Sequence, residues 1–456
     1  MNLVLFNSLS RTKEEFKPIG DPVGLYTCGP TVYNFQHIGN LRTYVFEDIL
    51  KRVLLYNKFS VSHVMNITDV GHLTGDRDMG EDKLELGAKR EGKTAHEIAD
   101  FYLQAFKKDL VSLHIIEPNT WCKATDFIQE QIDLIKTLEE KGFVYVTSDG
   151  VYFDTSKFGE YNKLSHLKLD ELKEGARIEK NEEKKNPTDF ALWKFSPEGA
   201  KREMEWDSPW GTGFPGWHIE CSAMSLHFLK DHLDIHCGAV DHINIHHTNE
   251  IAQSEAATGK KFFNYWLHGE FLNLGEGEKM AKSTGNFLTL EAETIKKHID
   301  PLAFRYMCFL THYRKAINYK SEALEQANAA LVNLRRAISE LGSELTEVDE
   351  ETKKTFLEAI NDDLNMPQAI AIVQSLLKSD LSPTIKLATI KDFDTVLGLE
   401  LIGETLPAEI IELMSARDGA RAMKDFDTSD RIRKEIEEKG YIVEDGPEGK
   451  TKVLKK

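Results

Sequence analysis

The chain has 456 residues, a formal net charge of −18, 41% hydrophobic residues and 29% charged residues. A chain of this length can bury a large core, and we expect about three domains. The sequence has no apolar run of the roughly 20 residues that span a bilayer, no signal-peptide pattern, and only five scattered cysteines. These features argue against a membrane-spanning or disulfide-stabilised secreted protein and predict a cytoplasmic one.

The negative charge is unevenly distributed along the chain. From Ala416 to Lys456 there are 11 lysines and arginines and 10 aspartates and glutamates, a net of +1, so the remaining residues carry −19. A nearly neutral tail with clustered cations on an acidic body is compatible with a surface that faces phosphates. It is equally compatible with a solvated charged tail.

The first hundred or so residues alternate between strand patterns and helix patterns. Strands are predicted at 23–29 and 59–68, and helices at 40–56 and 94–113. Thr94 and Glu97 form a capping-box signature at the start of the second helix. This alternation predicts parallel strand pairing and a doubly wound α/β fold.

The middle of the chain interrupts this pattern. Residues 126–142 are predicted to be helical, and "FVYVTSDGVYFD" predicts a hairpin that turns at residues 148–150. The stretch from Lys168 to Lys185, rich in lysine and glutamate, is expected to be a mobile insertion. The α/β alternation resumes in "WHIECSAMSLHFLKDHLDIHCG" at 217–238, so residues of about 121–215 form the interruption.

The last third of the chain is predicted to be mostly helical. After Asp300 the apolar spacing, as in "KSEALEQANAALVNLRRAISEL", suits a helical bundle. A shorter segment from about residue 405 ends in "GYIVEDGPEG", which predicts a strand and a turn.

The first motif with chemical potential is "HIGN". His37, Gly39 and Asn40 stand where a predicted strand feeds a helix, the place where α/β sheets bind ligands. Gly39 allows close approach, the helix N-terminus attracts anions, and His37 and Asn40 add side-chain donors. The cluster suits a phosphate, although a histidine at a turn is more often structural.

The second motif is "GEKMAKSTGN" at 277–286, which follows a predicted hairpin. It places Lys279 and Lys282 on a loop flanked by glycines, where two lysines could clamp a polyphosphate. Either motif alone could be an ordinary turn or loop, but both together, about 240 residues apart, are hard to attribute to chance.

"HIGN" followed by "KMAKS" resembles the paired ATP-binding motifs of class I aminoacyl-tRNA synthetases. Within that class, "YTCGPTVYNFQHIGN", "PGWHIECSAM", "HHTNEIAQSEA" and "NYWLHGEF" resemble the cysteinyl-tRNA synthetase family. The resemblance extends over essentially the whole chain, including "THYRKAINYKSEAL" and "DRIRKEIEEKGYIVEDGPEG".

Two single positions and one segment depart from the family pattern. Asn40 replaces the usual second histidine of the first motif, and Ala281 replaces the middle serine of the second. "VDHINIHHTNE" stands in place of the more usual "VDLIFPHHENE", so the start of the helix that carries His246 and Glu250 could be shaped differently. None of these changes removes a residue to which we assign essential chemistry.

The sequence also offers a candidate metal site. His246 and Glu250 are spaced i, i+4, which puts both on one face of a helix. With Cys28 and Cys221 they would supply two thiolates, an imidazole and a carboxylate, a set suited to tetrahedral zinc. Spacing alone does not select these four, because other candidates compete with them: His236, Cys237, His242 and His247.

The family resemblance selects Cys28, Cys221, His246 and Glu250 and implies one zinc per chain. It implies that the metal binds the substrate thiolate and so distinguishes cysteine from serine, whose hydroxyl is a poor zinc ligand. Each thiol could instead be a small buried hydrophobe, the reading we adopt for Cys122 and Cys308.

The resemblance also implies the remaining site residues and the reaction. Thr68, Trp217 and His236 would complete the amino-acid pocket, and Gly238 and Asp241 would meet the ATP ribose, with Mg²⁺ accompanying ATP. His37, Asn40, Lys279 and Lys282 would serve catalysis; His37, Gly39, Asn40 and Lys282 would also bind ATP. The implied partners are tRNA(Cys), L-cysteine and ATP. The protein is expected to be a monomer.

The implied domains follow the predicted elements. We expect a Rossmann-type catalytic domain in two parts, 1–120 and 216–265, split by a connective insertion at 121–215. A loop region with "KMAKS" at 266–300 would precede a helical bundle that binds tRNA at 301–404 and an anticodon-binding domain at 405–456.

Two other functions remain possible at this stage. A related ligase could pass activated cysteine to an amino sugar, although such ligases lack the full anticodon-binding end. A catalytically silent regulator is the second, although both lysines, His37 and all four metal ligands are retained in this sequence.

Overall fold

The structure is a computed structural model, and its residues fall into two compact units, Met1–Leu399 and Glu400–Lys456. It describes these residues: 2–71, 84, 87, 91–166, 182–196, 202–230, 232–274, 278–279, 287–402, 408–445 and 451–455. Within these ranges no helix has both the length and the apolar character needed to cross a membrane.

The centre of the first unit is a five-stranded sheet in which every neighbouring pair is parallel. Its strands, in spatial order, are β11 (Tyr265–Gly269), β10 (Ile235–Ala239), β3 (Val23–Thr27), β4 (Val61–Ile67) and β5 (Thr120–Lys123). All five residues of β3 are buried, as expected for a strand covered on both faces. The predicted parallel α/β sheet is confirmed.

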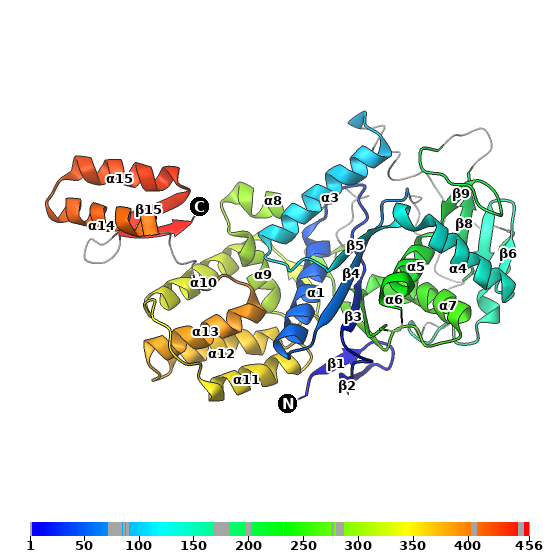
Figure 1. Cartoon of the computed structure of the whole chain (residues 1–456), viewed down its shortest axis with the longest axis horizontal. Helices are drawn as coiled ribbons and strands as arrows, with labels where there is room; N and C mark the ends of the chain where they lie inside the picture. The colour runs from blue at the N-terminus through cyan, green and yellow to red at the C-terminus, as the bar shows by residue number, and fades with distance from the viewer. Residues whose placement is uncertain are drawn as a thin grey trace. The chain divides into compact units, whose positions relative to one another are not determined.

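Helices cover both faces of this sheet (Figure 1). On one face lie α1 (Ile38–Tyr56) and α3 (Ala95–Ser112). Tyr44 of α1 and Phe106 of α3 pack against each other, with their ring centroids 4.7 Å apart. On the other lie α4 (Ile128–Glu140), α5 (Trp217–Leu229) and α7 (His246–Thr258). The predicted capping box is present at the start of α3. The Thr94 side chain accepts from the backbone amide of Glu97, and the Glu97 side chain accepts from that of Thr94.

The connections between these strands create a switch point in the sheet. From β3 the chain moves through α1 to β4 and through α3 to β5, whereas from β10 it moves through α7 to β11 on the other side. The carboxyl ends of β3 and β10 are therefore adjacent, with helices leaving in opposite directions. Such a crevice is where open α/β sheets bind ligands.

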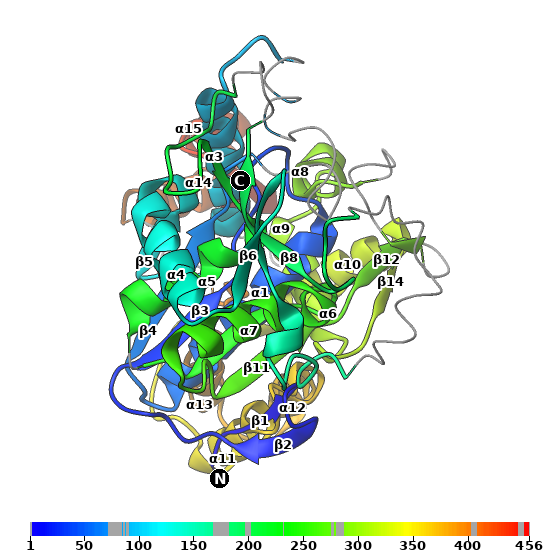
Figure 2. The same ribbon diagram turned by 90° about the vertical axis from the view of Figure 1, so that its right-hand side faces the viewer.

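The interruption folds as its own antiparallel sheet. In order, its strands are β6 (Val144–Val146), β7 (Gly150–Phe153), β8 (Phe190–Phe195) and β9 (Gly213–Pro215). Figure 2 looks from the side on which β6 and β8 lie. The predicted hairpin is confirmed, but most of the Lys168–Lys185 stretch, residues 168–181, lies outside the described residues.

The helices after Asp300 form the predicted bundle against α1. They are α9 (Pro301–Phe309), α10 (Ser321–Ser339), α11 (Glu350–Asn361), α12 (Met366–Lys378) and α13 (Pro383–Leu397). Three of them begin with a capping side chain and a proline in the first turn: Asp300 accepts from the amide of Leu302, Asn365 from that of Gln368, and Ser382 from that of Ile385.

Smaller elements complete the first unit. They are the hairpin of β1 (Val4–Asn7) and β2 (Thr12–Glu15), the sheet of β12 (Leu272–Leu274), β13 (Glu278–Lys279) and β14 (Ile317–Tyr319), and the short helices α6 (Asp241–Asn244) and α8 (Leu290–Glu293).

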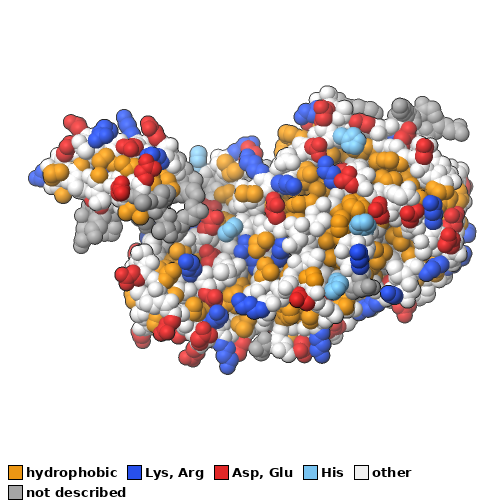
Figure 3. All heavy atoms as spheres, in the orientation of Figure 1, with side chains coloured by type: hydrophobic (Ala, Val, Ile, Leu, Met, Phe, Trp, Pro, Cys, Tyr) orange, Lys and Arg blue, Asp and Glu red, His pale blue; other side chains and the backbone are white. Residues whose placement is uncertain are grey.

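The second unit pairs two helices with a hairpin. It contains α14 (Ala408–Ala422), α15 (Phe426–Glu438), β15 (Tyr441–Asp445) and β16 (Thr451–Lys455), around a small core of Ile410, Ile432, Ile436, Val443 and Val453. On the face of this unit that Figure 3 shows, basic and acidic side chains are interspersed. The predicted strand is confirmed, whereas the turn after it, residues 446–450, lies outside the described residues.

Candidate active site

A cavity of about 250 Å³ opens at the switch point of the parallel sheet. Its walls come from the loop after β3, from the segment that joins β9 to α5, and from the turn that joins β10 to α6. Residues from the sequence analysis that line it are Cys28, Asn40, Thr68, Trp217, Cys221, Asp241 and His246. Residues separated by more than 200 positions thus share one pocket.

The four predicted metal ligands lie together, and three of them, Cys28, Cys221 and His246, line this cavity. Cys28 follows β3, Cys221 lies in α5, and His246 and Glu250 lie on successive turns of α7. One ligand atom from each lies within 4.8 Å of the others, and all four residues are buried. The helical spacing brings Nε2 of His246 to 2.8 Å from Oε1 of Glu250.

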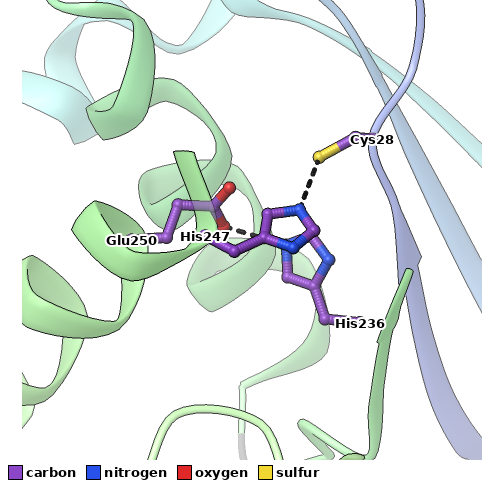
Figure 4. A group of neighbouring side chains, drawn as sticks. All are labelled: Cys28, His236, His247 and Glu250. Atoms are coloured by element: carbon purple, nitrogen blue, oxygen red, sulfur yellow. Dashed lines mark hydrogen bonds and ion pairs between the residues drawn. The ribbon is translucent and has the colours of Figure 1, made fainter. Parts of the chain in front are cut away.

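A second set of side chains overlaps the first. It consists of Cys28, His236, His247 and Glu250, also within 4.8 Å of one another (Figure 4). Sγ of Cys28 lies 3.3 Å from Nε2 of His247, and Oε2 of Glu250 lies 2.8 Å from Nε2 of His236. Two of the competitors left open by the sequence, His236 and His247, therefore contact the predicted ligands directly.

The charges of the first set respond strongly to burial and to one another. Hydrogen bonding with Cys28 lowers the pKa of Cys221 to about 7, helped by His246. Burial alone would raise the pKa of Glu250, but His236 and His246 lower it to about 2. Burial alone would lower the pKa of His246, but the nearby Glu250 outweighs this effect, and the pKa rises to about 10. Cys221 and Glu250 are therefore the acidic members of the set, whereas burial and the nearby Cys221 raise the pKa of Cys28 well above its ordinary value.

The donor types in the first set fit zinc. Two sulfurs, one imidazole nitrogen and one carboxylate oxygen form a set typical of tetrahedral zinc sites. The second set holds a single sulfur, and its two histidines lie where residues that orient metal ligands usually lie. His247 in turn contacts His268, and His268 contacts Ser8, each at 2.8 Å.

The "HIGN" residues form the start of α1. Nδ1 of His37 accepts from the amide of Asn40 at 3.0 Å, and Oδ1 of Asn40 accepts from the amide of His37 at 3.4 Å. A Cβ at Gly39 would lie 2.9 Å from Nδ1 of His37, so glycine makes room for the imidazole. Of these three, Asn40 lines the cavity.

The three residues predicted to bind the substrate amino acid differ in their position relative to the cavity. Thr68 lines the cavity and accepts a hydrogen bond from Nδ2 of Asn66 at 3.1 Å. Trp217 also lines the cavity, and its ring centroid lies 4.3 Å from that of His246. His236 is fully buried and bonded to Glu250, behind the metal set.

The lysine motif is only partly described. Lys279 lies in the two-residue strand β13, where its backbone is paired with Asn273 of β12, so the prediction that it lies in a loop was wrong. Lys282 lies outside the described residues. Cys122 and Cys308 are buried, as predicted.

The structure also adds residues that the sequence analysis did not assign to the pocket. His218, His242 and Lys194 line the cavity. His218 contacts His246 through their Nδ1 atoms at 2.9 Å, and Lys194 bonds Asp149 and Tyr152 at 2.6 and 3.0 Å. The quoted "WHIEC" and "VDHIN" segments carried a signal for the histidines, but nothing in the sequence pattern pointed to Lys194.

This fold and site define a class I aminoacyl-tRNA synthetase. The family model described as "tRNA synthetases class I (C) catalytic domain" matches residues 15–329. A solved methionyl-tRNA synthetase from Mycobacterium tuberculosis, bound by methionyl-adenylate, has the same fold, with a TM-score of 0.58, 14% identity, and coverage of 90% of this chain and 96% of that one. A leucyl-tRNA synthetase from Agrobacterium radiobacter in a ternary complex has a TM-score of 0.59 at 11% identity, with 84% of each chain covered.

More similar relatives narrow the class. The model described as "Cysteinyl-tRNA ligase anticodon binding domain" matches residues 404–451. Cysteine–tRNA ligase 1 of Burkholderia lata is 49% identical, over 98% of this chain and 96% of its own length. Cysteine–tRNA ligase of Treponema denticola is 43% identical, over 98% of both chains. The chain belongs to the cysteinyl-tRNA synthetase family and is an enzyme of the ligase class.

Proposed function

We propose that this chain activates L-cysteine with ATP and transfers it to the 3′ end of tRNA(Cys), and that zinc selects cysteine over serine. The observation that carries the proposal is the buried cluster of Cys28, Cys221, His246 and Glu250, of which all but Glu250 line the cavity. A pocket for a thiol substrate with a soft cation site in its wall gains a selectivity that apolar packing cannot supply.

Cys28, Cys221, His246 and Glu250 would hold one zinc per chain. When bound, the metal supplies a coordination position that favours a thiolate over a hydroxyl. His247 and His236 would orient Cys28 and Glu250, since each lies within hydrogen-bond reach of its partner. Thr68 and Trp217 would enclose the amino acid. His236 would contribute to the same pocket indirectly, through its contact with Glu250.

ATP would lie across the ends of β3 and β10. His37, Gly39 and Asn40 at the start of α1 would receive phosphate, Gly238 and Asp241 would meet the ribose, and Lys279 and Lys282 would contact the polyphosphate together with Mg²⁺. The positive end of α1 supports this assignment because developing phosphate charge is stabilised there.

The reaction would proceed in two steps without a covalent enzyme intermediate. The cysteine carboxylate attacks the α-phosphate of ATP, forming cysteinyl-adenylate and releasing pyrophosphate. The terminal ribose hydroxyl of tRNA then attacks the acyl carbon and releases AMP. Positioning and charge stabilisation would supply most of the acceleration.

The remaining parts of the chain would bind tRNA. We assign contact with the tRNA stem to residues 266–300, tRNA binding to the bundle at 301–404 and anticodon binding to 405–456. The two catalytic halves, 1–120 and 216–265, would flank the connective insertion at 121–215. We further propose a cytoplasmic monomer.

Two assays test this proposal. Cysteine-dependent exchange of pyrophosphate into ATP should be detected with the full chain, and serine should support far less exchange. Purified tRNA(Cys) should then become charged with cysteine. Exchange without tRNA charging would assign the chain to a ligase with another acceptor, and absence of exchange would refute the activity.

A further inference from the structure

His242 occupies a position in the cavity that no assigned role explains. It lies in α6, directly after the carboxyl end of β10, and lines the cavity beside Asp241. Its ring centroid lies 6.2 Å from that of Trp217, 5.2 Å from that of His246 and 5.1 Å from that of His247. The imidazole therefore lies between the proposed amino-acid wall and the proposed ribose segment.

One ring nitrogen of His242 lacks a partner. Nδ1 is buried, and it makes no hydrogen bond to any residue that the structure describes. A buried polar atom without a partner is uncommon in folded proteins and calls for an explanation. In either tautomer a neutral imidazole offers one N–H donor and one acceptor nitrogen.

The main chain beneath His242 is adapted to this ring. A Cβ at residue 238 would lie 2.6 Å from Nδ1 of His242 and 2.8 Å from Cε1 of His247. Glycine at this position therefore lets both imidazoles pack on the end of β10. His242 belongs to neither group of side chains that could hold a metal, so metal binding does not account for its orphaned nitrogen.

Because His242 lines the cavity, a substrate bound there is the candidate partner for its ring. Cysteinyl-adenylate places its side chain at the proposed metal set and its ribose at Gly238 and Asp241, so the group between them is the mixed anhydride that links carbonyl and phosphate. The oxygens of this linkage carry the charge that develops during activation, and a neutral imidazole N–H can donate to one of them.

We propose that His242 is a substrate-binding residue whose imidazole donates a hydrogen bond to the linkage between the cysteinyl carbonyl and the α-phosphate. This inference rests on the proposed function and adds to it a contact made by a residue where the usual family segment has leucine. It assigns a purpose to one of the three departures from the family pattern.

The test compares three variants in the full-length, zinc-loaded protein: His242→Leu, His242→Asn and His242→Gln. Asparagine and glutamine keep a donor near the positions of Nδ1 and Nε2, respectively, whereas leucine keeps only apolar bulk. We expect His242→Leu to lower cysteine-dependent pyrophosphate exchange about tenfold and to weaken binding of the analogue 5′-O-(cysteinyl-sulfamoyl)adenosine by a similar factor. Binding of cysteine alone and of adenosine alone should stay within twofold, and one of the two amide variants should restore most of the loss.

A matched control is His227→Leu, because His227 lies on the exposed side of α5 with 45% of its side chain accessible. It should exchange pyrophosphate at the wild-type rate. Wild-type rates in His242→Leu, equal losses in all three variants, or loss of zinc from His242→Leu would overturn the inference. The proposed function would survive each of these results and would fail only if the wild-type protein showed no exchange.

Discussion

Cys221 offers the most direct substitution in the metal set, since it lies in α5 with its thiol against Cys28 and His246. Replacing it with serine exchanges a sulfur ligand for an oxygen that binds zinc poorly. Cys221→Ser should lose zinc, measured as metal per chain, and its affinity for cysteine and its preference for cysteine over serine should fall together. ATP should still bind, because the residues proposed to bind it remain.

Cys122→Ser is the matched control for that substitution. Cys122 is also buried, but its thiol donates to the backbone oxygen of Met65, a bond that a serine hydroxyl can replace. It should retain one zinc per chain and wild-type selectivity. If Cys221→Ser kept its zinc and its selectivity, Cys221 would not be a ligand.

For individual residues, the sequence identified candidate metal ligands but not how they are arranged in space. The i, i+4 spacing of His246 and Glu250 could be predicted because helix geometry fixes it. The proximity of Cys28 to residues of α5 and α7 depends on how the sheet is wound, which local spacing does not encode. Contacts of His247 with Cys28 and of Lys194 with Asp149 likewise arise only from the tertiary fold.

A buried ionic cluster ties the catalytic sheet to the bundle. Asp48 of α1 pairs with Arg52 at 2.7 Å and with Arg305 of α9 at 2.5 Å, and the exposed fraction of all three side chains is 6% or less. Arg305 also donates to the backbone oxygen of Leu397 at the end of α13. The Asp48–Arg305 pair therefore joins α1 to α9, and Arg305 extends the connection to α13.

Asp48→Asn should lower the free energy of unfolding by about 3–5 kcal/mol, because it leaves two buried guanidinium groups without their counter-charge. Chemical denaturation at neutral pH would measure this loss. The surface variant Asp133→Asn should change stability little, since Asp133 is largely exposed and 3.4 Å from Lys136. Equal stabilities of Asp48→Asn and wild type would show that the cluster does not hold the bundle to the sheet.

The contribution of Asp48 should also depend on pH. Burial alone would raise the pKa of Asp48, but Arg305 and Arg52 together hold it below its ordinary value. A carboxyl whose pKa is lower in the folded state stabilises the protein above its unfolded pKa of about 3.9, and the benefit disappears as pH falls through the folded pKa. The stability gap between wild type and Asp48→Asn should therefore be constant from pH 5 to pH 8 and narrow below about pH 4.

Most elements could be predicted from local patterns, because periodicity and caps act over a few residues. The capping box of Thr94 and Glu97, the hairpin at 148–150 and the long helix of the bundle all follow from such patterns. The assignment of Lys279 to a loop failed because β13 is only two residues long and depends on its partner β12. A strand that short carries no periodicity of its own.

The whole chain divides after Leu399, and the two units should differ in function. A protein ending at Leu399 keeps every residue that we assign to cysteine activation. It should exchange pyrophosphate at close to the full rate yet charge tRNA(Cys) poorly, because the second unit contains the segment that matches the anticodon-binding model. Circular dichroism and a thermal melt should first show that the truncated chain is folded. Normal charging by the folded, truncated protein would remove the second unit from tRNA recognition.

Net charge was a weak guide at this scale. The value of −18 indicated nothing specific about partners, and the compensation in the last 41 residues was visible only when the segment was counted separately. Local patterns did foresee the helical bundle and a separate C-terminal segment, whereas length alone suggested about three domains. The two compact units are defined by tertiary contacts, which neither composition nor length specifies.

The central claim is that the substrate thiolate joins a metal held by Cys28, Cys221, His246 and Glu250, and cobalt spectroscopy tests it most directly. Protein loaded with Co²⁺ in place of zinc should show absorption bands from sulfur-to-metal charge transfer. Adding L-cysteine should intensify and shift these bands as a third sulfur enters the coordination shell, whereas L-serine should leave them unchanged. Spectra that respond to neither amino acid, or to both equally, would contradict the account and leave the buried thiols with a structural role alone.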